Sequence, residues 1–507
     1  MTAAFMALGK DALVAQQLAR LLYTNLRFEE ALKWAEEAKS LLPHDTFVLD
    51  TLGQVYKRWF YHMCDTVEDK NPSPERSVEI ISTALKGISA FRASENKPNK
   101  ENVSLNNSYY GEVDVGCRLL KFLSHVTVFS HDTGCSEMMK YLLTDYIPAE
   151  VQIPWQKFSS NLKGLQKRLY HALECISEDL SYFQTEISQE EEELDARDPE
   201  QVHRPREWLT KKSTVYASFF CEILDMEENL KDSKCSEMCS STESLTSFQR
   251  QMKTYQLGAG NAMSILSLIY DKKTERAGKK LESIIDMYPQ NLKRNDLDET
   301  ELANFIFCQI SLNCTFPGSS KLLSLQNLQM LSMGFKTKGV NMSPARSIFL
   351  LSLLFWPQMD DDSDSNKSRI LVSAIDTLQM LFEQKNRQMS LRKSRLVNHF
   401  YLAKAKGLNK IVHRSAIGDP FKGTSNERKL KWLGGEVWKT QQAKQLLKRV
   451  DGWTENGRLF THGAMTDSKI RIIPQNYASL PNGNENVTFY LGFSYNGAVA
   501  CDVEVKE

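Results

Sequence analysis

Residues 12–56 read ALVAQQLARLLYTNLRFEEALKWAEEAKSLLPHDTFVLDTLGQVY and contain two copies of one helical pattern. Three positions of the first copy recur 34 residues later in the second: Leu18 as Leu52, Ala19 as Gly53 and Leu22 as Tyr56. An internal repeat of this length indicates helical units that stack along the chain. One such unit cannot bury its apolar face alone, so we expect further helices to follow.

The stretch between the two copies matches the second half of a tetratricopeptide repeat, whose period is about 34 residues. Its predicted helix carries three small residues on one face: Ala31, Ala35 and Ala38. Small side chains let this helix pack closely against the first, and Pro43 ends it. Gly53 takes the position of Ala19, so we expect it at a close helix crossing. An ordinary amphipathic helix pair is the alternative.

The composition is that of a globular protein with several domains. The chain has 507 residues, 41% of them hydrophobic and 25% charged, and its formal net charge is zero. No secretory signal pattern occurs near the start, and the dense apolar run 348–356 is about half as long as a bilayer span and predicts a buried helix. Ten scattered cysteines favour reduced thiols and a cytoplasmic location.

Helical periodicity continues as far as residue 428. We predict tetratricopeptide-like repeats over 1–150, a helical scaffold with acidic loops over 151–428 and a β-barrel over 429–507. The scaffold includes a long helix over 158–183 with a candidate partner over 208–226. Its acidic runs, 190–200 and 360–364, are typical of solvated loops.

The last eighty residues have glycines, aromatic residues and period-two alternation in place of the helical period. Five strands are predicted, at 432–438, 458–462, 469–473, 487–495 and 498–505, with a short helix or ordered loop over 440–450. Five strands in so short a stretch favour a small barrel of the OB-fold type, whereas an immunoglobulin-like sandwich needs more strands.

The final hairpin has two candidate registers. A two-residue turn at Asn496-Gly497 would place the apolar residues of its strands on opposite faces. A three-residue loop over 495–497 would bury one continuous face and needs Gly497 in the left-handed region. We therefore expect these pairs: Phe493 with Val499, Leu491 with Cys501, Phe489 with Val503, and Val487 with Val505.

Positive charge gathers before and within the predicted barrel. Residues 385–450 contain seventeen Lys or Arg and three acidic residues. A solvated surface and a nucleic-acid interface are both compatible with this imbalance. The second hypothesis assigns phosphate contacts to Arg392, Lys393, Arg395, Lys404, Lys406 and Lys410. On the strands that an OB-fold uses for single strands, it adds Arg458, Phe460, Lys469 and Arg471.

No pattern of catalytic or metal-binding residues occurs. The chain has no phosphate-binding loop of the form G-x-x-x-x-G-K-[ST] and no nucleophile elbow. Cys235 and Cys239 lack two further zinc ligands, and the acidic run at 360–364 lacks the glycine and glutamate of a calcium-binding EF-hand. We therefore predict no catalytic residue, no metal site and no cofactor.

Both ends of the chain resemble one family. Leu26-Arg-Phe-Glu-Glu-Ala-Leu-Lys-Trp34 with Leu52-Gly-Gln-Val-Tyr56, and Trp432-Leu-Gly-Gly-Glu-Val-Trp438, are similar to the C-terminal part of the sterile alpha motif domain-containing protein 9 and 9-like family. The resemblance implies helical repeats followed by an OB-like domain. It also implies a cytoplasmic, interferon-induced protein linked to antiviral defence, growth restriction, translational repression and early endosomes. The family's sterile alpha motif, nuclease-like and nucleotide-binding modules would lie upstream of this fragment.

These observations predict a non-catalytic regulatory or sensing part of an antiviral effector. In this interpretation the helical repeats bind protein partners, and the basic region with the barrel binds single-stranded or structured RNA. A protein-interaction scaffold associated with endosomes, whose barrel serves only for packing, is the alternative.

Overall fold

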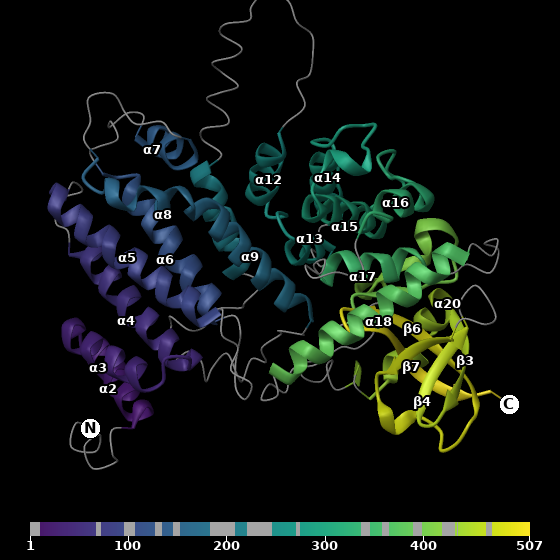
Figure 1. Ribbon diagram of the computed structural model, residues 1–507. Helices are drawn as coiled ribbons and strands as arrows, with labels where there is room; N and C mark the ends of the chain where they lie inside the picture. The colour runs from purple at the N-terminus through teal and green to yellow at the C-terminus, as the bar shows by residue number, and fades with distance from the viewer. Residues whose placement is uncertain are drawn as a thin grey trace, which may run out of the picture. The chain divides into compact units, whose positions relative to one another are not determined.

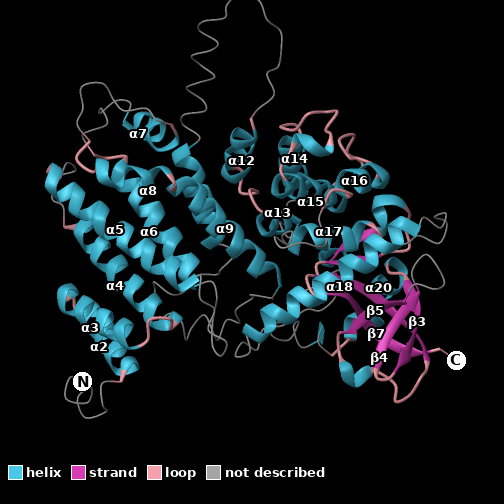
Figure 2. Cartoon of the chain, in the orientation of Figure 1, coloured by secondary structure: helices cyan, strands magenta, loops and turns pink. Residues whose placement is uncertain are grey.

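A computed structural model describes most of the chain (Figure 1). The described residues are 11–66, 72–95, 107–126, 134–144, 153–182, 208–220, 246–269, 274–335, 345–356, 365–388, 398–417, 431–432, 434–462 and 469–506. Both acidic runs lie outside them. In the described part, Figure 2 shows helices over most of the chain and strands only towards the C-terminus. The predicted fold class, a helical region followed by a small barrel, is confirmed.

The chain divides into two compact units. One contains residues 1–176, 211–241 and 386–392, and the other contains 177–210, 242–385 and 393–507. The barrel strands and the helices from 247 to 385 therefore belong to one unit. The domain boundaries at 150 and 428 stay predictions.

The first unit begins with a run of helices, the first five of which pack on their neighbours in the chain. They are α2 (Ala12–Thr24), α3 (Phe28–Leu41), α4 (Thr46–Asp65), α5 (Pro74–Glu95), α6 (Asn107–Leu123) and α7 (Gly134–Leu143). Helix α4 begins 34 residues after α2, and each of the two is capped by an aspartate that accepts backbone N–H bonds, Asp11 and Asp45. Helix α3 ends at Leu41, just before Pro43.

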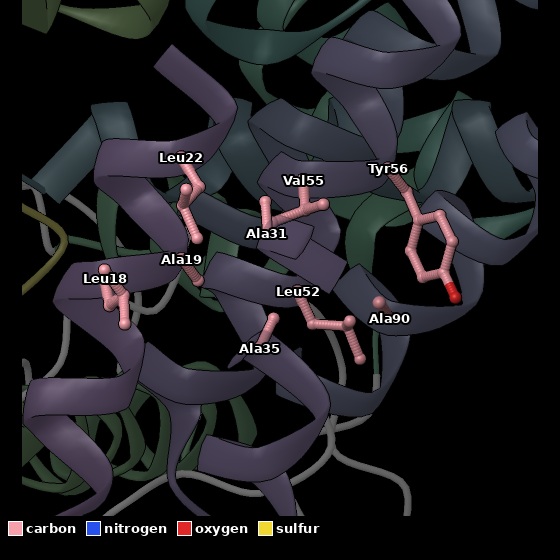
Figure 3. Close-up of a cluster of buried hydrophobic side chains, with 9 residues drawn as sticks. All are labelled: Leu18, Ala19, Leu22, Ala31, Ala35, Leu52, Val55, Tyr56 and Ala90. Atoms are coloured by element: carbon pink, nitrogen blue, oxygen red, sulfur yellow. The ribbon is translucent and has the colours of Figure 1, made fainter. Parts of the chain in front are cut away.

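Most residues of the repeat pattern belong to one buried cluster (Figure 3). Its members are Leu18, Ala19, Leu22, Ala31, Ala35, Leu52, Val55, Tyr56 and Ala90. They come from α2, α3, α4 and α5, so the apolar faces of four successive helices meet there. The alanines of α3 are fully buried, which brings its backbone close to its neighbours.

Gly53 packs against an aromatic ring of the next helix. A Cβ atom at Gly53 would lie 2.6 Å from the Phe91 ring, and one at Gly111 of α6 would lie 2.5 Å from it. The Phe91 ring of α5, which is fully buried, therefore fits between two helices that approach it closely only because both positions lack a side chain.

Replacing Gly53 with leucine should lower the free energy of unfolding by about 1–3 kcal/mol, because the added side chain overpacks the site of Phe91. Urea unfolding followed by circular dichroism measures the change. Gly318→Leu is a matched control, since a Cβ atom there meets nothing within 4 Å. Equal unfolding curves for wild type and Gly53→Leu would contradict the packing described for this helix pair.

The predicted long helix over 158–183 is divided. A short 3-10 turn, η1 (Gln156–Phe158), and α8 (Ser159–Lys163) precede Gly164, and α9 (Leu165–Tyr182) follows it. The candidate partner is helical over 208–220. Gln166 donates a hydrogen bond from Nε2 to the Tyr216 hydroxyl over 2.7 Å, which joins α9 to this helix.

The second unit contains two almost completely buried helices. Its helices are α12 (Ser247–Gln256), α13 (Ala262–Ile269), α14 (Thr274–Ile285), α15 (Glu299–Thr315), α16 (Leu325–Ser332), α17 (Ala345–Leu354) and α18 (Ser365–Gln388). Every residue of α17 is buried, as is every residue of α15 from Glu301 to Asn313. Helix α17 contains most of the apolar run predicted as a buried helix. A helix buried on all sides belongs to the core of a large unit.

Five strands close into a barrel. They are β3 (Arg449–Glu455), β4 (Arg458–His462), β5 (Lys469–Pro474), β6 (Asn486–Ser494) and β7 (Gly497–Val505). The hydrogen-bonded order is β3-β4-β5-β7-β6, and β6 returns to β3. Among these pairs only β5 and β7 are parallel. This closed five-stranded arrangement is the barrel expected of an OB-like domain. Two short strands, β1 (Phe400–Leu402) and β2 (Ile411–His413), extend the sheet from β6.

The first predicted strand is wrong. Residues 434–439 form a turn and a 3-10 helix, η5 (Glu436–Lys439), and Gly435 has φ +76°, which extended backbone does not allow. The two tryptophans of this segment, Trp432 and Trp438, pack edge to face with ring centroids 5.7 Å apart. Their apolar spacing reflects burial beside the barrel. The first strand of the barrel is β3, which was not predicted. Helix α20 (Gln441–Leu446) occupies the stretch predicted as a short helix or loop.

The final hairpin follows the predicted register only at its far end. Val487 pairs with Val505 as expected, but Phe493 pairs with Ala498, one residue away from its predicted partner. The shift occurs between Thr488 and Tyr490. Gly497 has the expected positive φ, +107°. Near the turn both faces of β6 are buried, from Tyr490 to Ser494, so burial of one face does not select the register there.

Candidate nucleic-acid interface

The outward face of β3, β4 and β5 carries the candidate site. Along β4 and β5 buried and accessible residues alternate, because successive side chains of a strand point to opposite faces. Leu459, Ile470 and Ile472 fill the inside of the barrel. The residues between them are at least partly accessible, and they include all four barrel residues predicted to contact nucleic acid.

Three rings lie together on this face, and we call Trp453, Phe460 and His462 the aromatic platform. Trp453 and Phe460 are directly opposite each other on β3 and β4, with centroids 6.0 Å apart and ring planes 28° apart. The ring of His462 lies 4.4 Å from that of Trp453. Aromatic side chains held on a strand surface offer planes on which unpaired bases stack.

Positive charge surrounds the platform. The Lys469 ammonium lies 4.8 Å from the centroid of Phe460 and 5.9 Å from that of Trp453. Arg471 lies opposite Phe460 in the register of β4 and β5, and exposed Arg458 begins β4. Cations beside a stacking surface can contact the phosphates of a single strand while its bases lie on the rings.

A carboxylate next to Lys469 belongs to the same face. Glu455, at the end of β3, forms an ion pair with Lys469. Hydrogen bonds from Lys469 and from Trp453 lower the pKa of this carboxyl group. Since a carboxylate with a lowered pKa stays ionised at neutral pH, the ion pair is present there.

The remaining predicted cations are placed elsewhere. Arg392, Lys393 and Arg395 lie outside the described residues. Lys404 and Lys406 are exposed in the turn after β1, which pairs with β6 and not with the strands of the platform. The predicted phosphate contact of Lys410 is wrong, because its side chain is buried and its ammonium donates a 2.6 Å hydrogen bond to the carbonyl oxygen of Trp356. Lys410 satisfies carbonyl groups at the end of α17.

Trp453 was not predicted because β3 was not recognised, and His462 was not assigned although its strand, 458–462, was predicted. The sequence signal for β3 is Asn456-Gly457, a dipeptide that favours the two-residue turn of a β-hairpin. Both residues of this turn have positive φ, +51° and +70°. Placing a hairpin there would have paired Trp453 with Phe460 across it.

Other kinds of site have little support in the described part of the chain. No group of three or more histidine, cysteine, aspartate or glutamate residues there could hold a metal ion. No described helix combines the length and apolar character needed to cross a bilayer. The structure thus defines a helical-repeat protein with a five-stranded barrel whose surface joins aromatic and basic side chains.

Comparison with known proteins agrees with the resemblance noted in the sequence. No model of a protein family matches the chain. The chain is 28% identical to human sterile alpha motif domain-containing protein 9-like and 26% identical to human sterile alpha motif domain-containing protein 9, in each case over 98% of this chain and 32% of the relative. The mouse 9-like protein is 25% identical over 98% of this chain. The resemblance is confirmed, and the match is consistent with a C-terminal region of that family. The chain spans about a third of the length of these relatives.

Proposed function

We propose that this chain is a non-catalytic regulatory part of an antiviral and growth-restricting effector, and that its barrel binds single-stranded RNA through the aromatic platform. The similarity to sterile alpha motif domain-containing proteins 9 and 9-like supports the first part. The pairing of Trp453 with Phe460 beneath the Lys469 ammonium supports the second. Both observations support a module that acts by binding a ligand.

The arrangement of the platform favours a single strand over a duplex. Bases within a duplex stack on each other and cannot lie on protein rings, whereas unpaired bases can. The rings of Trp453 and Phe460 stand next to each other on neighbouring strands, which offers stacking surface for adjacent bases. Stacking on aromatic side chains contributes about 1–3 kcal/mol per base and depends little on base identity.

The helical repeats have a different role in this proposal. Stacked helical repeats form extended surfaces that bind other proteins. The repeat face would therefore bring a protein partner, cytoplasmic or on early endosomes, to an effector whose barrel holds RNA. If the barrel serves only for packing, the same chain is a protein-interaction scaffold.

Binding of the intact chain to a fluorescent oligouridine of about 12 nucleotides, a length that one OB-fold can cover, tests the proposal. We expect measurable binding at low salt, read as fluorescence anisotropy. A duplex of the same length should bind more weakly. Absence of binding even at low salt would reject RNA recognition and leave the protein-interaction scaffold.

The cations beside the platform should determine the salt dependence of this binding. Each phosphate contacted on a single strand steepens the fall of log affinity with log salt by about 0.7. Replacing Arg458 and Arg471 with glutamine should therefore make the slope shallower by about 1.4 if each contacts one phosphate. The comparison requires titrations at several salt concentrations.

A matched control removes two charges elsewhere. Lys33 on α3 and Lys86 on α5 are exposed, so glutamine at both positions changes the net charge of the chain by the same amount. This variant should keep the wild-type slope. Equal salt slopes for the wild type and both double variants would mean that Arg458 and Arg471 contact no phosphate.

A further inference from the structure

The ammonium group of Lys469 lies over the two rings on which RNA bases would stack. Its distances to the centroids of Phe460 and Trp453 are 4.8 and 5.9 Å, and the centroids themselves are 6.0 Å apart. The ammonium and the two centroids thus form a compact triangle whose shortest side joins Lys469 to Phe460. The ammonium therefore lies within cation–π distance of both rings at once.

Glu455 holds Lys469 in this place. The residues come from β3 and β5, the two strands that flank β4, so their ion pair spans the strand that carries Phe460. Both side chains are partly exposed, 49% for Lys469 and 38% for Glu455. Water and salt weaken a pair of this kind, so a competing anion can open it.

We propose that Glu455 and Lys469 form a latch over the aromatic platform that single-stranded RNA opens. This inference rests on the proposed RNA binding. On opening, a phosphate replaces the Glu455 carboxylate as the partner of Lys469, and a base replaces the ammonium over the rings. Opening costs the Glu455–Lys469 ion pair and the contacts of Lys469 with the two rings. A ligand must offset both losses, the first with an anion and the second with a flat ring, so Glu455 acts as a specificity residue.

A neutral ligand or an anion without a base meets only half of this requirement. Inorganic phosphate can pair with Lys469 but offers no ring to cover Trp453 and Phe460. A free nucleoside has a ring but no charge to replace Glu455. Both should compete weakly with the oligouridine, whereas a short oligonucleotide should compete well.

Replacing Glu455 with glutamine tests the latch, because it removes the charge that holds Lys469 and keeps the size of the side chain. We expect oligouridine to bind about twofold to fivefold more tightly at low salt, the range set by the strength of exposed ion pairs. The fall of log affinity with log salt should stay close to that of the wild type, because Lys469 contacts one phosphate in both complexes.

Asp451→Asn is the matched control. Asp451 is an exposed acid on the same strand whose ion-pair partner is Lys506, so its replacement changes the net charge equally without touching Lys469. A third variant, Lys469→Gln, should abolish the effect of Glu455→Gln when the two are combined. Such non-additivity identifies the Glu455–Lys469 ion pair as the cause of the change in affinity.

The outcomes separate the latch from RNA binding itself. If the wild-type chain binds oligouridine and Glu455→Gln binds more tightly than Asp451→Asn, the latch is supported. If both variants bind alike, or if Glu455→Gln keeps its effect in the Lys469→Gln background, the latch is rejected while RNA binding stands. If the wild-type chain binds no RNA at low salt, both proposals fail.

Discussion

Replacing Trp453 and Phe460 together with alanine should weaken oligouridine binding by about 30-fold or more. Each ring is expected to stack one base, which contributes about 1–3 kcal/mol, and a loss of 1.4 kcal/mol is a factor of ten in affinity. The single variants should each show part of this loss. Because no cation is removed, the dependence of binding on salt should stay close to that of the wild type.

Tyr477→Ala serves as the control for this experiment. Tyr477 is 64% exposed and belongs to a short 3-10 helix of the barrel, η6 (Tyr477–Ser479), outside the platform strands. Its loss should leave RNA affinity unchanged. Unaltered circular dichroism spectra would show that the platform variants remain folded. If the double variant binds as tightly as the wild type, the bases do not stack on these rings.

Replacing Phe349 with alanine should lower the free energy of unfolding by about 3–5 kcal/mol, as expected for a large aromatic residue removed from a core. Phe349 belongs to α17 and is fully buried. Its ring stacks on Tyr495 at the β6–β7 turn, with centroids 4.7 Å apart and planes 8° apart, and on Phe307 of α15 at 6.1 Å. It also contacts Phe400 of β1 at 6.3 Å.

This ring therefore joins helices and barrel within one unit. We expect helical and barrel signals to shift together in urea unfolding of Phe349→Ala, with far-UV circular dichroism reporting the helices and near-UV circular dichroism the aromatic core. Phe316→Ala, at an exposed position after α15, should change stability little. A loss below about 1 kcal/mol for Phe349→Ala would show that the ring does not stabilise the unit as its burial implies.

The candidate site was only partly predictable. Phe460 and Lys469 were placed correctly on neighbouring strands because their alternation with apolar residues is visible locally. Trp453 was not found, since it required the correct first strand, and Lys410 was misassigned because a lysine in a basic stretch looks exposed until the carbonyl groups it satisfies are known. The Glu455 contact with Lys469 joins residues 14 positions apart on strands that are not neighbours.

The helical repeats, the change to a barrel and the positive φ of Gly497 could all be predicted from the amino-acid sequence. Each of these depends on local spacing or on the backbone freedom of one residue. Three other features became visible only in the folded chain: the start of the barrel at β3, the shifted pairing near the last turn, and the meeting of Trp453, Phe460, Glu455 and Lys469 on one face. Apolar residues are buried equally well in a strand, a turn or a 3-10 helix, so their spacing alone cannot select one of these structures. Strand pairing and packing from distant parts of the chain make that selection.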